Sequence, residues 1–260
     1  MIAGQDLDAR VRILLDAADQ RREVERIDPD GALTENEAYA LQFQYVDYRV
    51  ANGDRVVGLK TGLTSKAKQQ TMGVLQPILG HVLASSVVPE GEPVHCGELI
   101  HPRAEPEIAF VLEHGLEGPV TAAQACRATA LVFPAIEIID SRFLNFRFGF
   151  GDVIADNTSA ARVIFGSASI RPTDADLRLL GMVYSKNGEV QSTAAGAAVL
   201  GNPWEALAWL ARRAWELGRP LQAGQMVLAG ALADAVFVNP GDNVRVEFDR
   251  LGSLSVTFAE

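Results

Sequence analysis

Several features that would define a secreted, membrane or disulfide-rich protein are scarce or missing in this sequence. Its two cysteines, Cys96 and Cys126, form no C-x-x-C motif and are too few for a disulfide framework. No apolar run approaches the ~20 residues that a membrane span needs. The N-terminal residues lack the basic region and apolar core of an export signal. We therefore expect a cytoplasmic protein.

Positive charge is also in short supply. The chain has 23 Lys and Arg residues against 33 Asp and Glu residues, which gives a formal net charge of −10. This balance argues against a protein that binds phosphate backbones, because such a protein needs a basic face. The sequence has no glycine-rich phosphate loop, internal repeat or low-complexity tract. What is present is an ordinary globular composition, with 48% hydrophobic and 22% charged residues in a chain of 260.

The first fifty residues carry helical patterns. Apolar residues recur at helical spacing between residues 6 and 27, which predicts an amphipathic helix. The Asp-Pro-Asp-Gly sequence at 28–31 ends that pattern. Thr34 and Glu37 then have the form of a capping box, which predicts a second helix to about Asn52. We expect residues 1–53 to form a helical N-terminal part and residues 54–260 to form the main domain.

The rest of the chain reads mostly as short strands. An Asn-Gly hairpin turn lies at 186–189, and Asn202-Pro203 opens a helix. Many short strands with few long helices between them predict an α+β fold, a mixed β-roll or barrel core with peripheral helices. The expected strands cover 56–60, 78–81, 105–112, 131–140, 161–165, 180–185, 226–229, 235–238, 244–248 and 253–258.

Three carboxylates stand out within these strands. Glu105 and Glu107 are two residues apart, so in an extended backbone their side chains point the same way. Two such carboxylates repel each other unless a cation lies between them, and a hard divalent ion such as Mg²⁺ or Mn²⁺ suits oxygen ligands. A bare Glu-x-Glu is also typical of a solvated edge strand. Glu137 is harder to explain in that way, because it interrupts an apolar run where an unpaired carboxylate is costly.

Two further features could belong to the same site. Lys60 ends a strand and could hold a substrate oxygen or move a proton, although an exposed charge at a strand end is equally typical. Residues 141–156 contain Arg142, Arg147 and four phenylalanines, which could form a lid or an aromatic surface loop. A divalent ion held by the carboxylates would act as a Lewis acid toward a 2-oxo acid.

A series of motifs runs in order over nearly the whole chain. The motifs cover residues 58–65, 72–74, 100–107, 134–137, 140–142, 155–157, 196–203 and 240–242. On these motifs the chain resembles the fumarylacetoacetate hydrolase superfamily, and within it the hydratase and decarboxylase subgroup.

The resemblance implies a site and an assembly. It implies a β-roll, a homo-oligomer, and Mg²⁺, or possible Mn²⁺, with no organic cofactor. It places Lys60 at the keto and carboxylate oxygens of the substrate, Asp156 as a catalytic group and Ser159 on the pocket wall. The implied metal ligands are Glu105, Glu107 and Glu137.

The resemblance also implies an activity. Residues 140–148 look more like those of the decarboxylases, which implies Mg²⁺-dependent decarboxylation of 2-oxo-3-hexenedioate to 2-hydroxypenta-2,4-dienoate in catechol meta-cleavage degradation. Arg142 or Arg147 would then steer the distal carboxylate. The alternatives are a 2-hydroxypenta-2,4-dienoate hydratase and a non-catalytic partner subunit of such a hydratase. A complex with a pathway hydratase is a further expectation.

Three positions depart from the pattern of that family. Pro106 stands between the two paired glutamates, so we expect an edge or a bulge of the strand there. Ala194 replaces the first glycine of a Gly-Ala-Gly-Ala-Ala pattern. Ala229 replaces a threonine whose hydroxyl would contact the substrate carboxylate, which bears on the choice of substrate and not on the metal.

Overall fold

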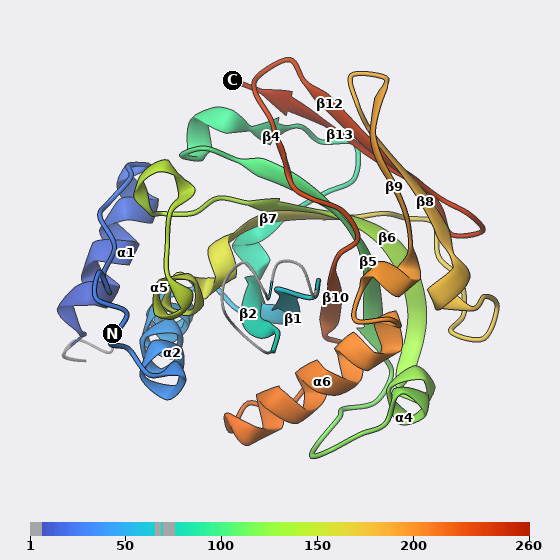
Figure 1. Cartoon of the computed structure of the whole chain (residues 1–260), viewed down its shortest axis with the longest axis horizontal. Helices are drawn as coiled ribbons and strands as arrows, with labels where there is room; N and C mark the ends of the chain where they lie inside the picture. Colours follow the sequence, from blue (N-terminus) through green and yellow to red (C-terminus); the bar gives the residue numbers. More distant parts are fainter. Residues whose placement is uncertain (1–6, 66–68, 70–75) are drawn as a thin grey trace.

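A curled, mixed β-sheet lies at the centre of the fold (Figure 1). The computed structural model describes residues 7–65, 69 and 76–260. In the described chain this first sheet has eight strands, in the order β2-β1-β10-β5-β6-β7-β3 with β11 paired to β5. The strands are β1 Val56–Gly62, β2 Ile78–Leu83, β3 Val87–Val88, β5 Arg103–Leu112, β6 Thr129–Ile139, β7 Ala160–Phe165, β10 Met226–Ala231 and β11 Val236–Phe237. The sheet curls far enough for β2 to contact β7, which gives it a concave interior.

A second sheet of five described strands packs beside β6, opposite the N-terminal helices (Figure 1). Its order is β4-β13-β12-β8-β9, and the Asn-Gly turn joins β8 to β9 as the sequence predicts. Its strands are β4 Val94–His95, β8 Gly181–Lys186, β9 Glu189–Ala195, β12 Asn243–Phe248 and β13 Gly252–Ala259. The predicted mixed β-roll with peripheral helices is therefore confirmed.

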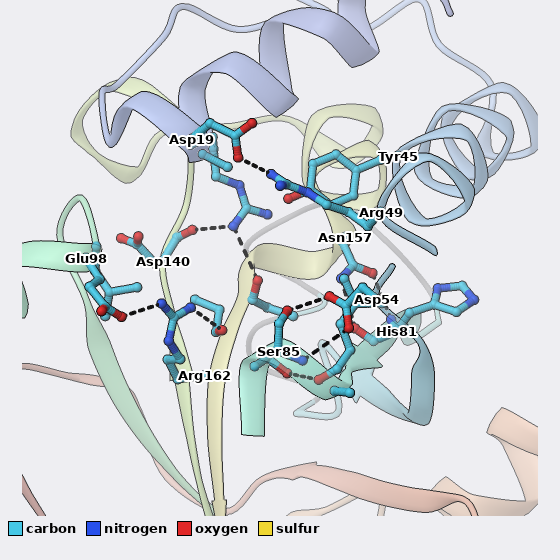
Figure 2. A pocket seen from close by; sticks show the side chains of 18 of the residues that line it. Asp19, Tyr45, Arg49, Asp54, His81, Ser85, Glu98, Asp140, Asn157 and Arg162 are labelled. Carbon is cyan, nitrogen blue, oxygen red and sulfur yellow. Dashed lines mark hydrogen bonds and ion pairs between the residues drawn. The ribbon is translucent and has the colours of Figure 1, made fainter. Parts of the chain in front are cut away.

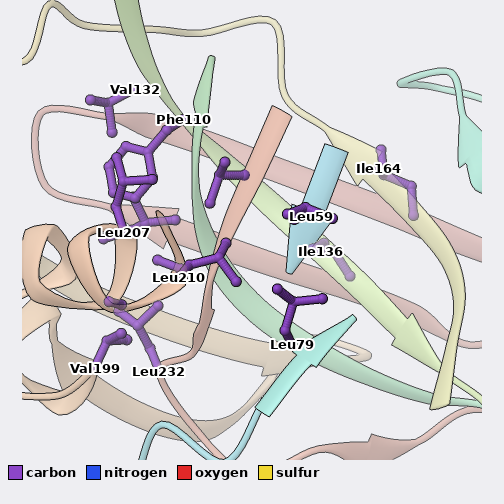
Figure 3. Close-up of a cluster of buried hydrophobic side chains, with 14 of the residues drawn as sticks. Leu59, Leu79, Phe110, Val132, Ile136, Ile164, Val199, Leu207, Leu210 and Leu232 are labelled. Carbon is purple, nitrogen blue, oxygen red and sulfur yellow. The ribbon is translucent and has the colours of Figure 1, made fainter. Parts of the chain in front are cut away.

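The apolar core lies between the first sheet and helix α6 (Pro203–Glu216), as Figure 3 shows. Asn202 caps this helix by accepting a hydrogen bond from the backbone N–H of Trp204. Leu207 and Leu210 project from one face of α6 onto the sheet, and both are fully buried. Each fully buried side chain of this kind contributes about 1.5–3 kcal/mol of hydrophobic stabilisation. This packing fixes the strands from one side and leaves the concave interior for polar groups.

The N-terminal part contains two helices, α1 (Ala9–Gln20) and α2 (Glu35–Ala51). Helix α1 packs against α2, and α2 packs against α5 (Phe150–Ala155). The predicted capping box of Thr34 and Glu37 opens α2. The expectation of one helix through residue 27 is wrong, because Arg21 adopts a left-handed conformation that ends α1. The following backbone pairs instead with the loop at 142–144, where Val24 donates to the Arg142 carbonyl and accepts from Leu144.

The structure also defines the boundaries of other helices and of the N-terminal part. A short helix, α4 (Ala122–Arg127), precedes β6 and ends because β6 begins at Thr129. Residues 150–155, expected as an irregular loop, form the buried helix α5. The motif at 72–74 lies outside the described residues. The division at residue 53 stays a prediction, and Ala38 and Tyr39 of α2 lie in the same core as the roll.

Pro106 lies beside a bulge, as expected. The pairing of β10 with β5 shifts between Leu228 and Ala231, so two residues of β10, at 229 and 230, face one residue of β5, at 108. The Pro106 carbonyl accepts a hydrogen bond from Leu232, just past the end of β10. Because the N–H and C=O of a strand residue point to the same side, the missing N–H of Pro106 lies on the side of Leu232 and takes no hydrogen bond from the pairing with β6. Among the described residues, no helix is long and apolar enough to cross a membrane.

Candidate active site

The three predicted carboxylates meet in the interior of the curled sheet. Glu105 on β5 lies directly opposite Glu137 on β6, and Glu107 follows on the same face of β5. All three side chains are buried, and each offers an oxygen within 4.8 Å of the others. Like charges opposite each other across a strand pair are destabilising, so this arrangement needs a positive charge between them.

Lys60 supplies part of that charge. It lies on β1, which β10 and β5 separate from β6 in the order of the sheet. The curl of the sheet nevertheless brings its Nζ to 2.7 Å from Oε1 of Glu137. The same ammonium group is 3.3 Å from the carbonyl of Thr158. Lys60 is buried, so the reading of an exposed charge at a strand end does not hold.

The cluster has a surplus of negative charge. Three carboxylates against one lysine leave two negative charges when all are ionised, which is the charge that one divalent cation balances. Burial, with the charge of Glu137 adding to it, raises the pKa of Glu107 well above its usual range. Burial also raises the pKa of Glu137, although Lys60 opposes the rise.

The oxygen atoms of the cluster fit a metal ion. Among the described residues, Oε1 of Glu107 and Oε2 of Glu137 are buried and have no hydrogen-bond partner. The other Glu107 oxygen, Oε2, accepts from the backbone N–H of Gly230 at 2.8 Å, which fixes the carboxylate. Gly230 has a φ of +109°, and a Cβ there would lie 2.4 Å from the Thr64 side chain, so only glycine fits. Such oxygens are the ligands that Mg²⁺ and Mn²⁺ prefer.

A strained turn forms the wall beside Lys60. Asn157, Thr158 and Ser159 are consecutive and have φ values of 48°, 54° and 58°. Residues other than glycine hold this conformation only when their surroundings impose it, and such strain gathers at functional sites. The Asn157 side chain imposes it here by bonding both the N–H and the C=O of His81 on β2, at 2.7 and 2.9 Å.

A cavity of about 650 Å³ opens next to the cluster. Lys60, Glu105 and Ser159 line one part of it, and Arg103, Phe146 and Arg147 line another. The volume lies in the range of small-molecule sites. Arg103 comes from β5, two residues before Glu105 on the same face, while Phe146 and Arg147 come from the loop before α5.

Arg103 is the cavity residue that sequence reasoning missed. Its guanidinium carbon lies 3.9 Å from the ring centroid of Phe146 and 4.0 Å from that of Phe237. The sequence did contain an indication of its position. Residues 103, 105 and 107 are two apart along one strand, so their side chains lie on the same face. The spacing alone did not show that two aromatic rings far apart in the sequence would close on it.

The structure gives different positions to the other predicted site residues. Ser159 and Arg147 line the cavity, but Arg142 and Asp156 do not. Those two are buried and paired with each other through Nε of Arg142 and Oδ1 of Asp156. Burial raises the pKa of Asp156 to about 6, although Arg142 opposes the rise. Their predicted roles stay predictions, and the geometry favours a structural ion pair.

A second cavity of about 660 Å³ lies between the N-terminal helices and the roll, and Figure 2 shows its lining. Its charged groups are already paired: Arg49 with Asp19 at 2.7 Å and Arg162 with Glu98 at 2.9 Å. The Asp54 carboxylate accepts from the hydroxyl and backbone N–H of Ser85. This cavity has the size of a ligand site, but the charged side chains named here, among the described residues that line it, are already paired.

Comparison with known proteins defines the family. Residues 55–259 match the fumarylacetoacetate hydrolase C-terminal family. A 4-oxalocrotonate decarboxylase of Pseudomonas sp. (strain CF600) is 44% identical over 227 residues, covering 87% of this chain and 86% of that protein. A 2-keto-4-pentenoate hydratase of Burkholderia vietnamiensis (strain G4 / LMG 22486) is 45% identical over 224 residues, covering 86% of each.

A solved structure agrees over almost the whole chain. The 4-oxalocrotonate decarboxylase from Pseudomonas putida G7, complexed with magnesium and adipate, superposes with a TM-score of 0.93 at 40% identity and covers 96% of both chains. Together with the fold and the carboxylate cluster, these matches define a metal-site β-roll protein. The chain belongs to the fumarylacetoacetate hydrolase C-terminal family.

Proposed function

We propose that this protein is a Mg²⁺-dependent lyase that decarboxylates 2-oxo-3-hexenedioate to 2-hydroxypenta-2,4-dienoate. The observation that carries this proposal is the distribution of charge in the 650 Å³ cavity. Its lining includes Lys60 and Glu105, beside the buried surplus of carboxylate, together with the two arginines Arg103 and Arg147. A diacid with an oxo group at one end and a carboxylate at the other suits such a cavity. The decarboxylase relative with bound magnesium and adipate, itself a six-carbon diacid, supports the same substrate class.

Glu105, Glu107 and Glu137 are the residues that would hold the ion. Mn²⁺ suits the same oxygen ligands, and none of the chemistry requires an organic cofactor. When bound, Mg²⁺ supplies a Lewis acid that stabilises negative charge on the oxygen at C2 of the substrate.

The electron flow of the reaction defines what the protein must do. The C5–C6 bond breaks and its electron pair passes through the C3–C4 double bond to the oxygen on C2, as C6 leaves as CO₂. That oxygen then takes up one proton to give the dienol. Among the described residues that line the cavity, Lys60 is the ammonium donor, and it can supply this proton from Nζ. The contact with Glu137 at 2.7 Å holds the ammonium group in place beside the cavity.

The departing carboxylate has a different requirement. It must be guided into place without being held so tightly that its ground state is stabilised against loss. Aromatic walls such as Phe146 and Phe148 exclude water, and a poorly solvated carboxylate loses CO₂ more readily.

Hydration of 2-hydroxypenta-2,4-dienoate is the second candidate function. The similarity of the hydratase relative, at 45% identity, favours it as much as the decarboxylase relative favours the first. The third candidate is a non-catalytic partner subunit of a hydratase. The intact carboxylate cluster argues against it. A cytoplasmic homo-oligomer, and a complex with a pathway hydratase, also belong to this proposal on the strength of the family resemblance.

The test supplies 2-oxo-3-hexenedioate with Mg²⁺, traps CO₂ and follows the dienol. We expect one CO₂ per diacid consumed, loss of activity with a chelator and recovery on adding Mg²⁺. The variant Glu107→Gln should need far more Mg²⁺, whereas Glu189→Gln on the exposed strand β9 should not. Hydration of the dienoate without CO₂ release from the diacid would replace the decarboxylase by the hydratase. No turnover of either compound would leave the partner-subunit reading.

A further inference from the structure

We infer that Arg103 binds the carboxylate at the far end of the substrate and thereby selects diacids over monoacids. This inference rests on the proposed function, since it assumes that the 2-oxo end lies at the carboxylate cluster. It assigns the distal contact to a residue of the central strand, whereas the sequence had pointed to Arg142 or Arg147.

The position of Arg103 along β5 matches the length of the substrate. A strand advances by ~3.4 Å per residue, so Arg103 lies about 7 Å along the strand from Glu105 and on the same face. Two residues of extended backbone span about as many bonds as a chain of six carbon atoms. An extended six-carbon diacid with its 2-oxo end at Glu105 therefore places its other carboxylate beside Arg103.

The surroundings of Arg103 leave its hydrogen-bonding edge available. Phe146 and Phe237 both pack against the guanidinium group, whose carbon lies 3.9 and 4.0 Å from their ring centroids. Among the described residues, its Nε is buried without a hydrogen-bond partner. The charge that acts on it is that of Glu105, two residues further along β5. Arginine stays charged in proteins and its planar fork matches a carboxylate. The two rings fix the plane of that fork before the substrate arrives.

Other arginines near the site are less suited to this role. Arg142 already donates to the Asp156 carboxylate and to the carbonyls of Asp140 and Ala160. Arg147 lines the cavity but is exposed, so water competes for its charge.

The loop that carries Phe146 is itself held by contacts from two directions. The His101 ring lies 4.9 Å from the Phe146 ring, and its Nδ1 is 2.9 Å from Oε1 of Glu23 in the N-terminal part. Its Nε2 is 2.6 Å from the Ser141 carbonyl. The N-terminal segment thus fixes one of the two rings that orient Arg103.

The experiment measures the binding of two inert 2-oxo acids by calorimetry in the presence of Mg²⁺. The diacid 2-oxoadipate lacks the C3–C4 double bond and so has no path for decarboxylation, and 2-oxohexanoate lacks the distal carboxylate. In Arg103→Gln we expect the Kd of the diacid to rise by about 10- to 100-fold, the value of a hydrogen-bonded charge pair. The Kd of the monoacid should change by less than about twofold, which also shows that the variant is folded.

Matched variants make the result decisive. Arg103→Lys keeps the charge without the planar fork and should recover part of the diacid affinity. Arg245→Gln, an exposed arginine on β12, should change neither Kd. Equal weakening of both acids in Arg103→Gln, no change in either, or a selective loss in Arg147→Gln alone would overturn the inference.

The failure of this inference is distinguishable from failure of the proposed function. CO₂ release by the wild-type enzyme tests the function without any variant. If the wild type releases CO₂ and Arg103→Gln keeps its preference for the diacid, the inference alone is wrong. If no CO₂ is released while Arg103→Gln loses that preference, the decarboxylase function is wrong and the diacid site remains.

Discussion

Two buried centres in this protein pair a carboxylate with a cation, and they differ in how completely their polar atoms are satisfied. In one, Arg142 donates to the Asp156 side chain and to the carbonyls of Asp140, Asp156 and Ala160. In the other, Lys60 contacts one of three carboxylates, and two carboxylate oxygens have no partner among the described residues. Complete pairing indicates a structural element, whereas a buried surplus of charge indicates a site for a ligand.

The two cavities repeat this contrast. They are nearly equal in volume, at about 660 and 650 Å³. The first is lined by ion pairs that are already formed, such as Arg49 with Asp19 (Figure 2). The second lies next to the cluster that holds the unpaired oxygens of Glu107 and Glu137, and Lys60 and Arg103 line it. The two cavities therefore do not differ in volume. They differ in whether the charged groups at the cavity are already paired.

The largest effect should come from breaking the satisfied centre. Arg142→Met removes the partner of a fully buried carboxylate, so we expect a loss of about 3–5 kcal/mol in the free energy of unfolding. The measurement is chemical denaturation at pH 7.5, above the pKa of about 6 that Asp156 has with Arg142 in place. Arg147→Met on the exposed loop should change stability by no more than about 0.5 kcal/mol.

The same variant can also refute the comparison. Below its melting temperature, folded Arg142→Met should retain activity within about tenfold of the wild type. A fully stable variant that has lost activity by 100-fold or more would place Arg142 in the substrate site, as the sequence had suggested.

The next effect should come from the unsatisfied centre and should fall on catalysis. Lys60→Met is expected to lower kcat/KM by at least ~10²-fold, because it removes a positioned proton donor. With Mg²⁺ bound, the ion compensates the remaining carboxylates, so the stability loss should be smaller than in Arg142→Met. Lys186→Met removes a lysine paired with Asp242 at the surface and should leave kcat/KM within about twofold.

The opposite result for Lys60→Met, a large loss of stability with normal kcat/KM, would show that the two centres do not differ in role. If Lys60→Met unfolds easily but its folded fraction turns over substrate normally, Lys60 is a structural lysine and its pair with Glu137 belongs with that of Arg142.

The parts of the site that could be predicted from the sequence are those that depend on residues close together along the chain. Glu105 and Glu107 could be placed on one face because strand periodicity is local, and Glu137 stood out because it interrupts an apolar run. The helix cap at Thr34 and the hairpin at Asn187-Gly188 were predictable for the same reason. Each of these depends on residues a few positions apart.

The parts that were missed depend on long-range geometry. Arg142 and Arg147 have the same chemistry and lie five residues apart, yet only the fold shows that one is buried against Asp156 and the other lines the cavity. Arg103 acquired its place because Phe146 and Phe237 converge from different parts of the chain. The early end of α1 likewise follows from backbone pairing with a loop more than a hundred residues away.

A third buried ionisable group, His81, sharpens the comparison because it lacks a counter-ion. Its Nδ1 lies 3.0 Å from the neutral amide oxygen of Gln42. Burial, with the charge of Arg219 adding to it, lowers the pKa of His81 from 6.5 to about 3, although Asp47 opposes the shift. The folded protein therefore holds this ring neutral, where the other two centres hold charged pairs.

The smallest effect we predict is an acid sensitivity caused by this ring. The folded pKa is lower than the unfolded value, so on acidification the unfolded chain takes up the proton first. The stability contributed by neutral His81 is complete above pH 6.5 and declines as the pH falls toward about 3. Between pH 7.5 and pH 5 this amounts to about 2 kcal/mol. The variant His81→Gln cannot titrate, so the difference in its unfolding free energy between these two pH values should be smaller by that amount. His114→Gln, at an exposed histidine, should match the wild type. If His81→Gln shows the full wild-type decline, carboxylates elsewhere cause the acid sensitivity and the neutral ring at β2 has no part in it.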